Sequence, residues 1–540
     1  MAVADESGLR TAIQTLVDYC AARELISEED RIWAYNTVLD CAGAKSPAPE
    51  ETWALGKAKA PAGFDLETAL LTIGGAAVET GAEEDTASGR DRIAMRVMGA
   101  LMPKPSEVAA RFRAAIAAGE PRRATDEFYA MCCDAGYVRR AAIARNVKWT
   151  TPTTWGNLEI TINLSKPEKD PREIAAAGSA KSDAKKYPAC QLCIENEGYP
   201  GRGVAAFGGA HPARQNLRII PIELAGERWG LQYSPYAYFN EHCIVMNAHH
   251  RPMHIDRNAL EHLLDFVDLL PHYFIGSNAD LPIVGGSILS HDHYQGGDHV
   301  FPMMRAESDQ TFSMLRYPNV RGEVLRWPLS VLRLRSGDRG EILNACVHVI
   351  DTWRCWSDES VGVRASEADG TPHNTVTPVV RRTNSGDYEA YLTLRCNVTS
   401  EQNPLGDFHP HAQWHHIKRE NIGLIEVMGL AVLPARLDDM EKGSWNLIQE
   451  TRALCGASWV RLRLSDRLAT FRRRSQPCSV VPASGSTYTR VPSPPRPSSR
   501  RPGRWSRRPS RMTRARSPNG PRACPSPQDA STSPAPRAPA

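Results

Sequence analysis

The sequence predicts an α+β protein with a mainly helical N-terminal region, antiparallel sheet units with helices, and a disordered C-terminal tail. Through the first 150 residues apolar positions recur every three or four residues, as in helices that bury one face. From about residue 155 apolar and polar residues alternate, as in half-buried strands. From about residue 457 the chain is largely Arg, Pro, Ser and Ala with almost no acidic residues, a composition that buries too little apolar surface to fold.

Helical signals occupy the region from residue 1 to about 150. The first helix is predicted from five apolar residues spaced to share one face, namely Leu9, Ile13, Leu16, Val17 and Cys20. A later helix follows a Pro-Ser start and repeats Val108, Phe112 and Ile116 at intervals of four. Thr125, with two acidic residues after it, predicts another helix N-terminus, because acids in the first turn complement the helix dipole.

Strand signals begin near residue 155. Residues 158–164 alternate Leu or Ile with polar residues, which predicts a strand with one buried face. The runs 217–224 and 229–233 also have strand character, and Ala225-Gly226-Glu227 lies between them. This arrangement predicts a hairpin, because a glycine in a short connection supplies the positive φ that a tight turn needs.

A strand, a helix and a second strand are predicted over the next 50 residues. Residues 242–247 form the first strand, and the apolar run 281–289 predicts the second as a buried one. Asp256 predicts the N-cap of the helix, and Pro271 ends it. Its inward face consists of five apolar residues, Leu260, Leu263, Leu264, Val267 and Leu270.

Length and composition limit the class of protein. A chain of 540 residues with 41% hydrophobic residues accommodates two to four domains with buried cores. The net charge of +4 gives no global indication of nucleic-acid binding, and no apolar run is long enough to span a membrane. Residues 1–10 include two acids and lack a signal-peptide pattern, so the 13 cysteines are expected as reduced thiols in a cytoplasmic protein.

The most informative motif lies at residues 285–297, where glycines and serines surround the run His291-Asp292-His293-Tyr294-Gln295. Side chains two residues apart project to the same side of an extended segment, so two imidazoles and a carboxamide share one face. A neutral imidazole is a good nucleophile toward phosphorus near pH 7, and an amide donates to a phosphoryl oxygen. Small neighbouring residues let a ligand approach the backbone. The motif therefore predicts a phosphoryl-transfer site.

The same stretch resembles the active-site segment of galactose-1-phosphate uridylyltransferases, a family related to the histidine-triad proteins. Further stretches are similar to the second, Gram-positive-type class of that family, at residues 158–171, 187–193, 233–236 and 415–429. The resemblance runs from about residue 10 to about residue 450. Several long and separated matches make it specific.

The resemblance implies both a fold and a reaction. After the helical region 1–150, it implies a histidine-triad-like catalytic unit over residues 151–335 and a second, degenerate unit over residues 336–450. The implied reaction belongs to galactose metabolism, and passes UMP from UDP-glucose to galactose 1-phosphate through a uridylyl-histidine in two steps. The expected partners are these small molecules, with no membrane and no specific nucleic acid, and a homodimer is left open.

The family's attacking residue is the second histidine of its pair, and His293 occupies that place. Gln295 is expected to hold the phosphoryl oxygen in the transition state, with Ser287 and Ser290 as further substrate contacts. The better-studied class has proline between the two histidines, whereas this chain has Asp292. On an alternating strand Asp292 points away from the phosphate, so repulsion does not follow. The alternative is that His293 only packs or binds a metal.

Cys190 and Cys193 have the spacing of half a zinc site, and no second pair of this kind occurs. The family supplies two histidines: the first of the pair, His291, and one shortly after a strand, which is His249 or His250. The even-numbered face of that strand favours His250. The predicted ion is a structural zinc that orients the segment carrying the nucleophile, and no organic cofactor is expected. The alternative is a pair of reduced core thiols.

Asn278, Arg214, Asn216 and Arg218 are candidate nucleotide contacts. Arginine forks suit phosphates, and the family has an asparagine on the α-phosphate side about where Asn278 stands. The alternative for these residues is a solvated surface. Because neither a Walker A nor a GxGxxG motif occurs, nucleotide binding is expected to rest on the fold around the histidine pair.

A second histidine cluster follows near the end of the resemblance and comprises His409, His411, His415 and His416. In related enzymes an H-x-H in this region contributes to an iron site. The alternatives are a polar surface or substrate contacts. The neighbouring Lys418 and Arg419 suit a sugar phosphate.

The tail, residues 457–540, has two interpretations. One is a basic, disordered segment that binds polyanions. The other is a high-GC gene read out of frame, which yields the same composition. The resemblance fades just before the tail begins, where the family still has folded sequence, and this favours the second interpretation.

Three functions fit the sequence. The first is the uridylyl transfer that the resemblance implies. The second is another nucleotidyl transfer on the same fold, such as a dinucleotide phosphorylase, and it differs in using inorganic phosphate instead of a sugar 1-phosphate as acceptor. The third belongs to a different class, a non-catalytic polyanion-binding protein that depends on the arginine-rich tail, so removal of the tail would abolish binding.

Overall fold

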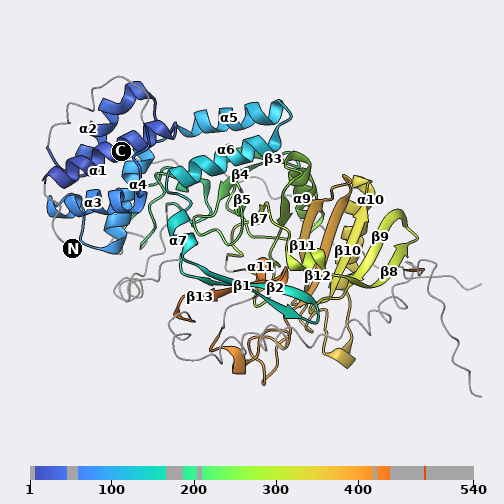
Figure 1. Ribbon diagram of the computed structural model, residues 1–540. Helices are drawn as coiled ribbons and strands as arrows, with labels where there is room; N and C mark the ends of the chain where they lie inside the picture. The colour runs from blue at the N-terminus through green and yellow to red at the C-terminus, as the bar shows by residue number, and fades with distance from the viewer. Residues whose placement is uncertain are drawn as a thin grey trace, which may run out of the picture. The chain divides into compact units, whose positions relative to one another are not determined.

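The residues that the computed structural model describes are 6–45, 59–165, 187–203, 210–286, 288–417, 422–437 and 480–481 (Figure 1). The chain divides into two units, residues 1–484 and 485–540, and every described element belongs to the first. The predictions for Ser287, Lys418, Arg419 and nearly all of the tail fall outside the described residues. Within those residues no helix is long and apolar enough to cross a membrane.

Helices make up the regular structure of the described residues before residue 146, as predicted. They are α1 (Glu6–Ala22), the 3-10 helix η1 (Glu28–Asp30), α2 (Arg31–Cys41), α3 (Leu66–Glu79), α4 (Ala87–Ala100), α5 (Pro105–Ala117), α6 (Pro121–Asp134) and α7 (Arg140–Ala144). The predicted face of α1 is confirmed, because all five of its residues are buried in a core shared with α2, α3 and α4.

The helix start predicted at Thr125 is wrong. α6 begins at Pro121, and Thr125 lies inside it with its hydroxyl donating to the Arg122 carbonyl at 2.9 Å. Proline suits the first helical position because the N–H that it lacks would have no partner there. For the start of α6, the proline is therefore a stronger signal than a threonine followed by two acidic residues.

A three-stranded sheet follows, in the order β1-β2-β13. β1 (Val147–Thr153) and β2 (Gly156–Asn163) form an antiparallel hairpin, and β13 (Leu430–Pro434) lies parallel to β2. The predicted alternation is confirmed in β2, where Leu158, Ile160 and Ile162 are buried. β13 lies far along the chain from β2, so the tertiary structure alone brings them together.

The described residues also form an eleven-stranded sheet in the order β14-β8-β9-β10-β12-β11-β6-β7-β5-β4-β3. Its neighbouring strands are antiparallel throughout. The strands are β3 (Ile220–Leu224), β4 (Glu227–Tyr233), β5 (Cys243–Asn247), β6 (Phe274–Gly276), β7 (His293–Gly297), β8 (Ser308–Met314), β9 (Tyr317–Leu325), β10 (Val331–Ser336), β11 (Asn374–Arg382), β12 (Tyr388–Cys396) and β14 (Val480–Val481). The predicted hairpin is confirmed, because β3 and β4 pair across Ala225 and Gly226, which both have positive φ.

The strand order repeats within the large sheet. In the first half β3, β4 and β5 precede helix α9 (Arg257–Leu269), and β6 and β7 follow it, with β7 returning beside β5. The second half repeats this order. Three strands, β8, β9 and β10, precede helix α10 (Arg339–Arg354), and two strands, β11 and β12, follow it, with β12 returning beside β10. The halves meet where β6 pairs with β11. The predicted antiparallel units with helices are therefore present, and the domain boundaries in residue numbers stay predictions.

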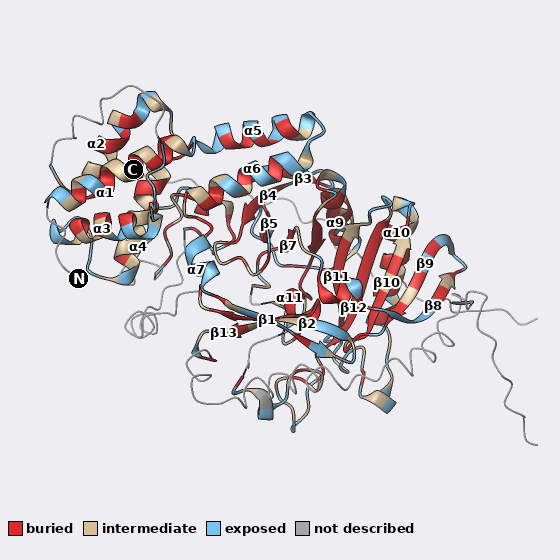
Figure 2. Cartoon of the chain, viewed as in Figure 1, coloured by how far each residue is buried: buried red, intermediate tan, exposed pale blue. Residues whose placement is uncertain are grey.

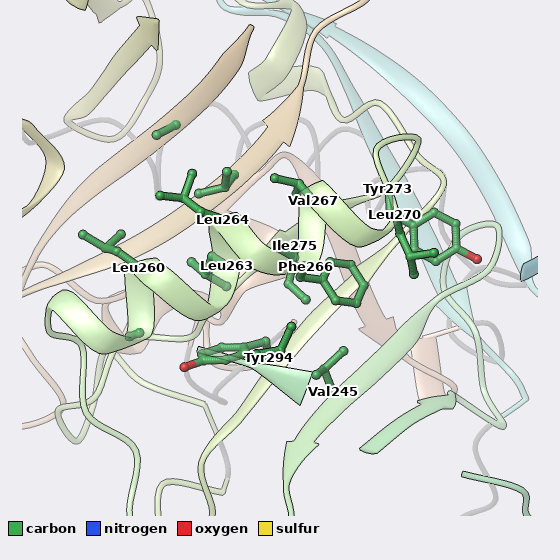
Figure 3. Packing of buried hydrophobic residues seen from close by; sticks show 14 of the residues in the cluster. Val245, Leu260, Leu263, Leu264, Phe266, Val267, Leu270, Tyr273, Ile275 and Tyr294 are labelled. Atoms are coloured by element: carbon green, nitrogen blue, oxygen red, sulfur yellow. The ribbon is translucent and has the colours of Figure 1, made fainter. Parts of the chain in front are cut away.

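α9 and α10 pack against the same apolar core on one face of the large sheet. Figure 3 shows side chains of α9 above Val245, Ile275 and Tyr294. The predicted cap of α9 is confirmed, because the Asp256 carboxylate accepts from the Ala259 N–H at 3.0 Å. The central strands β11 and β12 are buried almost throughout, whereas β8 and β9 near the edge are partly exposed (Figure 2).

A second apolar core covers the opposite face of the large sheet. It joins Phe274 of β6 and Val379 of β11 to β2 and β13, and it includes α11 (Leu424–Val427). Neighbouring residues of a strand face opposite sides, and Tyr294 faces α9. His293 and Gln295 therefore face the second side.

The segment before β7 departs from expectation. The apolar run 281–289 predicted a buried strand, but its described residues form turns and an isolated bridge between Ala279 and Gly285. Ile283 has φ of 72°, a left-handed conformation that a strand does not allow. The predicted burial is also largely wrong, because only Val284 and Gly285 are buried among the described residues of the run. A short apolar run by itself does not distinguish a strand from a loop.

Candidate active site

The candidate site lies where β7 begins, on the face of the sheet opposite α9. β7 pairs with β5 through His293 and Met246, and with β6 through Gln295 and Gly276. Continuing the second register by two residues places Asn278 opposite His293. Three of the side chains predicted from sequence are therefore neighbours at the same edge of this face.

The ring of His293 is fixed by its own backbone. Its Nδ1–H donates to the carbonyl oxygen of His291 at 2.7 Å. Since one nitrogen of a neutral imidazole carries the proton, this bond leaves Nε2 with a lone pair. Burial lowers the pKa of His293 to about 4, so the ring is neutral at pH 7. Neutral Nε2 is the form of histidine that attacks an electrophile.

Gln295 has its carbonyl oxygen engaged. Oε1 lies 3.1 Å from Nε2 of His242, the residue just before β5. His242 was expected in a strand but was assigned to no site. Because Ile244 pairs with Gln295, His242 is a diagonal neighbour on the same face. The sequence alone could not identify the contact between His242 and Gln295, because it depends on the register between β5 and β7.

Asn278 is held in the same manner. Its Oδ1 accepts from the backbone N–H of Leu424 at 2.8 Å, in the first turn of α11. A Cβ added to Gly286 would lie 2.6 Å from Asn278 Nδ2, so the amide nitrogen faces the loop before β7. In both Gln295 and Asn278 the amide oxygen is hydrogen-bonded within the protein, so the amide nitrogen is the atom that can donate to a ligand. Leu424 could not be found from sequence, since a backbone N–H carries no residue signal.

The structure brings together all four predicted metal ligands, Cys190, Cys193, His250 and His291. Cys190 Sγ lies 3.5 Å from Cys193 Sγ and 3.2 Å from His291 Nδ1, and Cys193 Sγ lies 3.2 Å from His250 Nδ1. A tetrahedral zinc with ordinary bond lengths separates its ligand atoms by roughly 3.3–3.8 Å. These three distances lie close to that range, and all four ligand atoms lie within 4.8 Å of one another, so a small contraction would bring the set to tetrahedral spacing. The donor set therefore suits such an ion, with His250 preferred over His249 as expected.

The orientation of His291 also suits a metal ligand. The ring is fully buried, and its Nε2–H donates to the Asn247 carbonyl at 2.9 Å. This bond fixes the tautomer that directs the Nδ1 lone pair at the cysteines. Burial raises the pKa of Cys193 to about 12, so a metal that binds there must displace a proton.

Asp292 lies on the opposite face from His293, as alternation predicts. Its carboxylate contacts the Arg251 guanidinium at 3.3 Å, and Arg251 also binds Glu227 at 2.5 Å. Burial raises the pKa of Asp292 to about 6, although Arg251 partly offsets this effect. The acid between the two histidines is therefore occupied away from the candidate site.

The structure does not bring the other predicted nucleotide contacts to His293. Asn216 donates to the Ala135 carbonyl at 3.0 Å, and the Arg218 Nε donates to the Pro103 carbonyl at 2.7 Å. Both side chains thus join the sheet region to the helical region. Arg214 donates to the Ala213 carbonyl at 3.1 Å. Ser290 is exposed in the loop before β7.

The second histidine cluster does not assemble into a ligand group within the described part of the chain. The Cys190 cluster is the one group of three or more candidate ligands found there. His411 Nε2 lies 3.3 Å from the Asp407 carbonyl, and His415 Nε2 lies 2.9 Å from the Pro410 carbonyl. These rings therefore bind the backbone of their own loop.

Two family models match the chain in succession. Residues 68–252 match the N-terminal domain of galactose-1-phosphate uridyl transferase, and residues 266–447 match its C-terminal domain. A solved structure, yeast Ap4A phosphorylase Apa2 in complex with AMP, aligns over 64% of this chain and 96% of its own, with 12% identity and a TM-score of 0.32. That alignment is too loose to support an argument.

Curated relatives match at much higher identity. The galactose-1-phosphate uridylyltransferase of Bacillus subtilis (strain 168) is 48% identical over 82% of this chain and 83% of its own length. That of Caldanaerobacter subterraneus subsp. tengcongensis is 48% identical over 79% of this chain and 80% of its own. The enzyme of the same name from Clostridium acetobutylicum is 44% identical over 83% of this chain and 87% of its own length. The chain therefore belongs to the galactose-1-phosphate uridyl transferase family of nucleotidyltransferases.

Proposed function

We propose that this protein transfers UMP from UDP-glucose to galactose 1-phosphate through a uridyl group held on His293. The observation that carries the proposal is the state of the His293 ring. It is neutral, its Nδ1–H is bound to the His291 carbonyl, and Gln295 follows two residues later on the same face of β7. Membership in the family supports the choice of substrates.

In the first step Nε2 attacks the α-phosphorus of UDP-glucose. An N–P bond forms, the bond from the α-phosphorus to the bridging oxygen breaks, and glucose 1-phosphate leaves with the electron pair. The imidazole gains positive charge, and the His291 carbonyl stabilises it through the Nδ1–H bond. In the second step a phosphate oxygen of galactose 1-phosphate attacks the same phosphorus, breaks the N–P bond and restores neutral His293.

The amide nitrogens of Gln295 and Asn278 supply donors for the non-bridging oxygens of the transferred group. Preoriented donors act in the transition state without the cost of reorganising solvent. Ser290, and Ser287 outside the described residues, are proposed as further contacts. Arg214 is the less buried residue of the predicted arginine pair, and it is proposed for the nucleotide.

We also propose zinc as the ion that Cys190, Cys193, His250 and His291 hold. Two thiolates and two imidazoles in tetrahedral spacing are the donor set of structural zinc. The ion would join the loop of Cys190 to the segment that enters β7. Its proposed effect on the reaction is indirect, since His291 also supplies the carbonyl that orients His293.

Incubation with UDP-glucose and galactose 1-phosphate, followed by product analysis, tests the proposal. UDP-galactose and glucose 1-phosphate are expected. A sample with UDP-glucose alone, quenched in alkali, should carry one uridylyl group on His293, because a phosphoramidate is stable to base and labile to acid. Transfer to inorganic phosphate in place of the sugar phosphate would instead identify a phosphorylase. Light scattering of the same preparation measures the oligomeric state, for which the sequence left a homodimer open.

A further inference from the structure

We propose that His242 is a positioning residue, which holds Gln295 so that its amide N–H groups face the phosphoryl group bound at His293. The inference rests on the proposed function for the identity of that group. Its structural part, the direction of the bond between His242 and Gln295, does not depend on the reaction. The two parts are therefore tested separately.

The position of the His242 ring is fixed by its surroundings. It is 2% exposed and stacks against Tyr238 and Phe239, with ring centroids 5.3 and 4.5 Å away. Phe239 in turn packs on Phe274 of β6, the strand on the other side of β7 from β5. A buried ring in contact with two aromatic side chains keeps its Nε2 at one place, 3.1 Å from Gln295 Oε1.

The proton of His242 decides how Gln295 is oriented. Burial lowers the pKa of His242 to about 4, so the ring is neutral and has one N–H. Nδ1 is buried and has no hydrogen-bond partner among the described residues. A buried N–H without an acceptor is rare and costly, so the proton belongs on Nε2, where it has one. Nε2–H then binds Oε1, and the amide nitrogen is directed the other way.

Loss of this donor would leave the amide free to turn over. Gln295 would then present its oxygen to the phosphoryl oxygens, and two acceptors repel. The effect belongs to the transition state, where charge on these oxygens is redistributed, so kcat should fall more than KM rises. If His242 only filled space, its substitution would lower the melting temperature without lowering kcat more than it raises KM.

Two substitutions at His242 separate the donor from the volume. His242→Phe keeps an aromatic ring in contact with Tyr238 and Phe239 but removes the donor. His242→Gln restores an amide N–H at about the reach of Nε2. We expect kcat to fall roughly tenfold to a hundredfold in His242→Phe and to recover in part in His242→Gln. Equal losses in both variants would overturn the donor role.

A double-mutant cycle tests whether His242 acts through Gln295. In the Gln295→Ala background, His242→Phe should cost no further activity, because the group that it positions is absent. Independent, additive losses would overturn the proposal. His262 provides the matched control, since it is also 2% exposed and binds Tyr294 on the other face of β7. His262→Phe should lower the melting temperature while kcat stays within about twofold.

Nitrogen NMR of labelled histidine decides the direction of the bond without any substrate. We expect the neutral tautomer of His242 with its proton on Nε2. A proton on Nδ1 would mean that Gln295 donates to His242, and would overturn the proposal even in an active enzyme. If the wild-type protein transferred no uridylyl group, the proposed function would fail, and the tautomer would still decide the assignment of His242.

Discussion

One carbonyl contact fixes the orientation of the His293 ring. The Nδ1–H bond to His291 selects the tautomer, and in the proposed reaction it would also stabilise the positive charge that develops on the ring. We predict that His293→Ala abolishes exchange between UDP-glucose and glucose 1-phosphate, while His293→Gly recovers part of it with added imidazole. Isotope exchange into UDP-glucose is the measurement. His348→Ala, on α10, is the control with wild-type exchange, and undiminished exchange in His293→Ala would contradict the assignment of the nucleophile.

Glu241 is a buried carboxyl whose protonation affects stability. Burial raises its pKa from the ordinary 4.5 to about 7, with Asp126 and Asp298 nearby adding to the effect, although the Tyr273 hydroxyl donates to it. The folded state therefore binds more protons between these values. The stability that Glu241 contributes is complete below about pH 4.5 and is lost as the pH rises through about 7.

Glu241→Gln removes this titration and keeps an acceptor for Tyr273. Between pH 5 and pH 8 the melting temperature of the wild type should fall by roughly 1–3 °C more than that of the variant. Differential scanning calorimetry in matched buffers measures the two curves. Parallel curves would show that Glu241 has the same proton affinity in both states.

At the scale of elements, the four candidate metal ligands come from three segments. They are the loop of Cys190 and Cys193, the end of the β5 segment at His250, and the entry to β7 at His291. We predict that Cys190→Ser and Cys193→Ser lose a tightly held divalent ion and melt several degrees lower, because such an ion contributes folding free energy. Elemental analysis and calorimetry check both effects. Cys355→Ser, at an exposed cysteine, should keep the ion.

The loop before β7 positions Asn278 through close backbone packing at Gly286. A methyl group there would lie 2.6 Å from Asn278 Nδ2 and displace the amide. Gly286→Ala should therefore lower kcat/KM for UDP-glucose by roughly tenfold or more, with a small change in melting temperature. Gly340→Ala is the matched control, because its Cβ would meet nothing closer than 3.4 Å. Equal activity in the two variants would place Asn278 outside the reaction.

At the scale of the whole molecule, the described residues of the tail are the two-residue strand β14, which pairs with the edge strand β8. The prediction that residues 457–540 are disordered and dispensable otherwise falls outside the described residues. We predict that truncation after Glu450 leaves transfer activity and melting temperature nearly unchanged. A second truncation after Ser484 retains β14, so any difference between the two measures that pairing. A large loss in both would show that the tail beyond Ser484 is part of the fold.

The sequence alone determined those features that depend on local periodicity or on residue type. The buried face of α1, the alternation in β2, the β3–β4 hairpin and the Asp256 cap all follow from short-range sterics and hydrogen bonding. The histidine pair and the Cys-x-x-Cys pair were also evident, because their chemistry is carried by the side chains themselves.

The tertiary structure decided the features that join distant segments. His242 meets Gln295, and Leu424 meets Asn278, across 53 and 146 residues of chain. Register between strands sets the first contact, and a sequence period does not encode register. The second contact depends on where α11 lies, which the sequence between the two residues does not encode. In the run before β7, Val284 and Gly285 are the buried ones among the described residues, because burial depends on what the fold places around each side chain and the local sequence records only that the side chains are apolar.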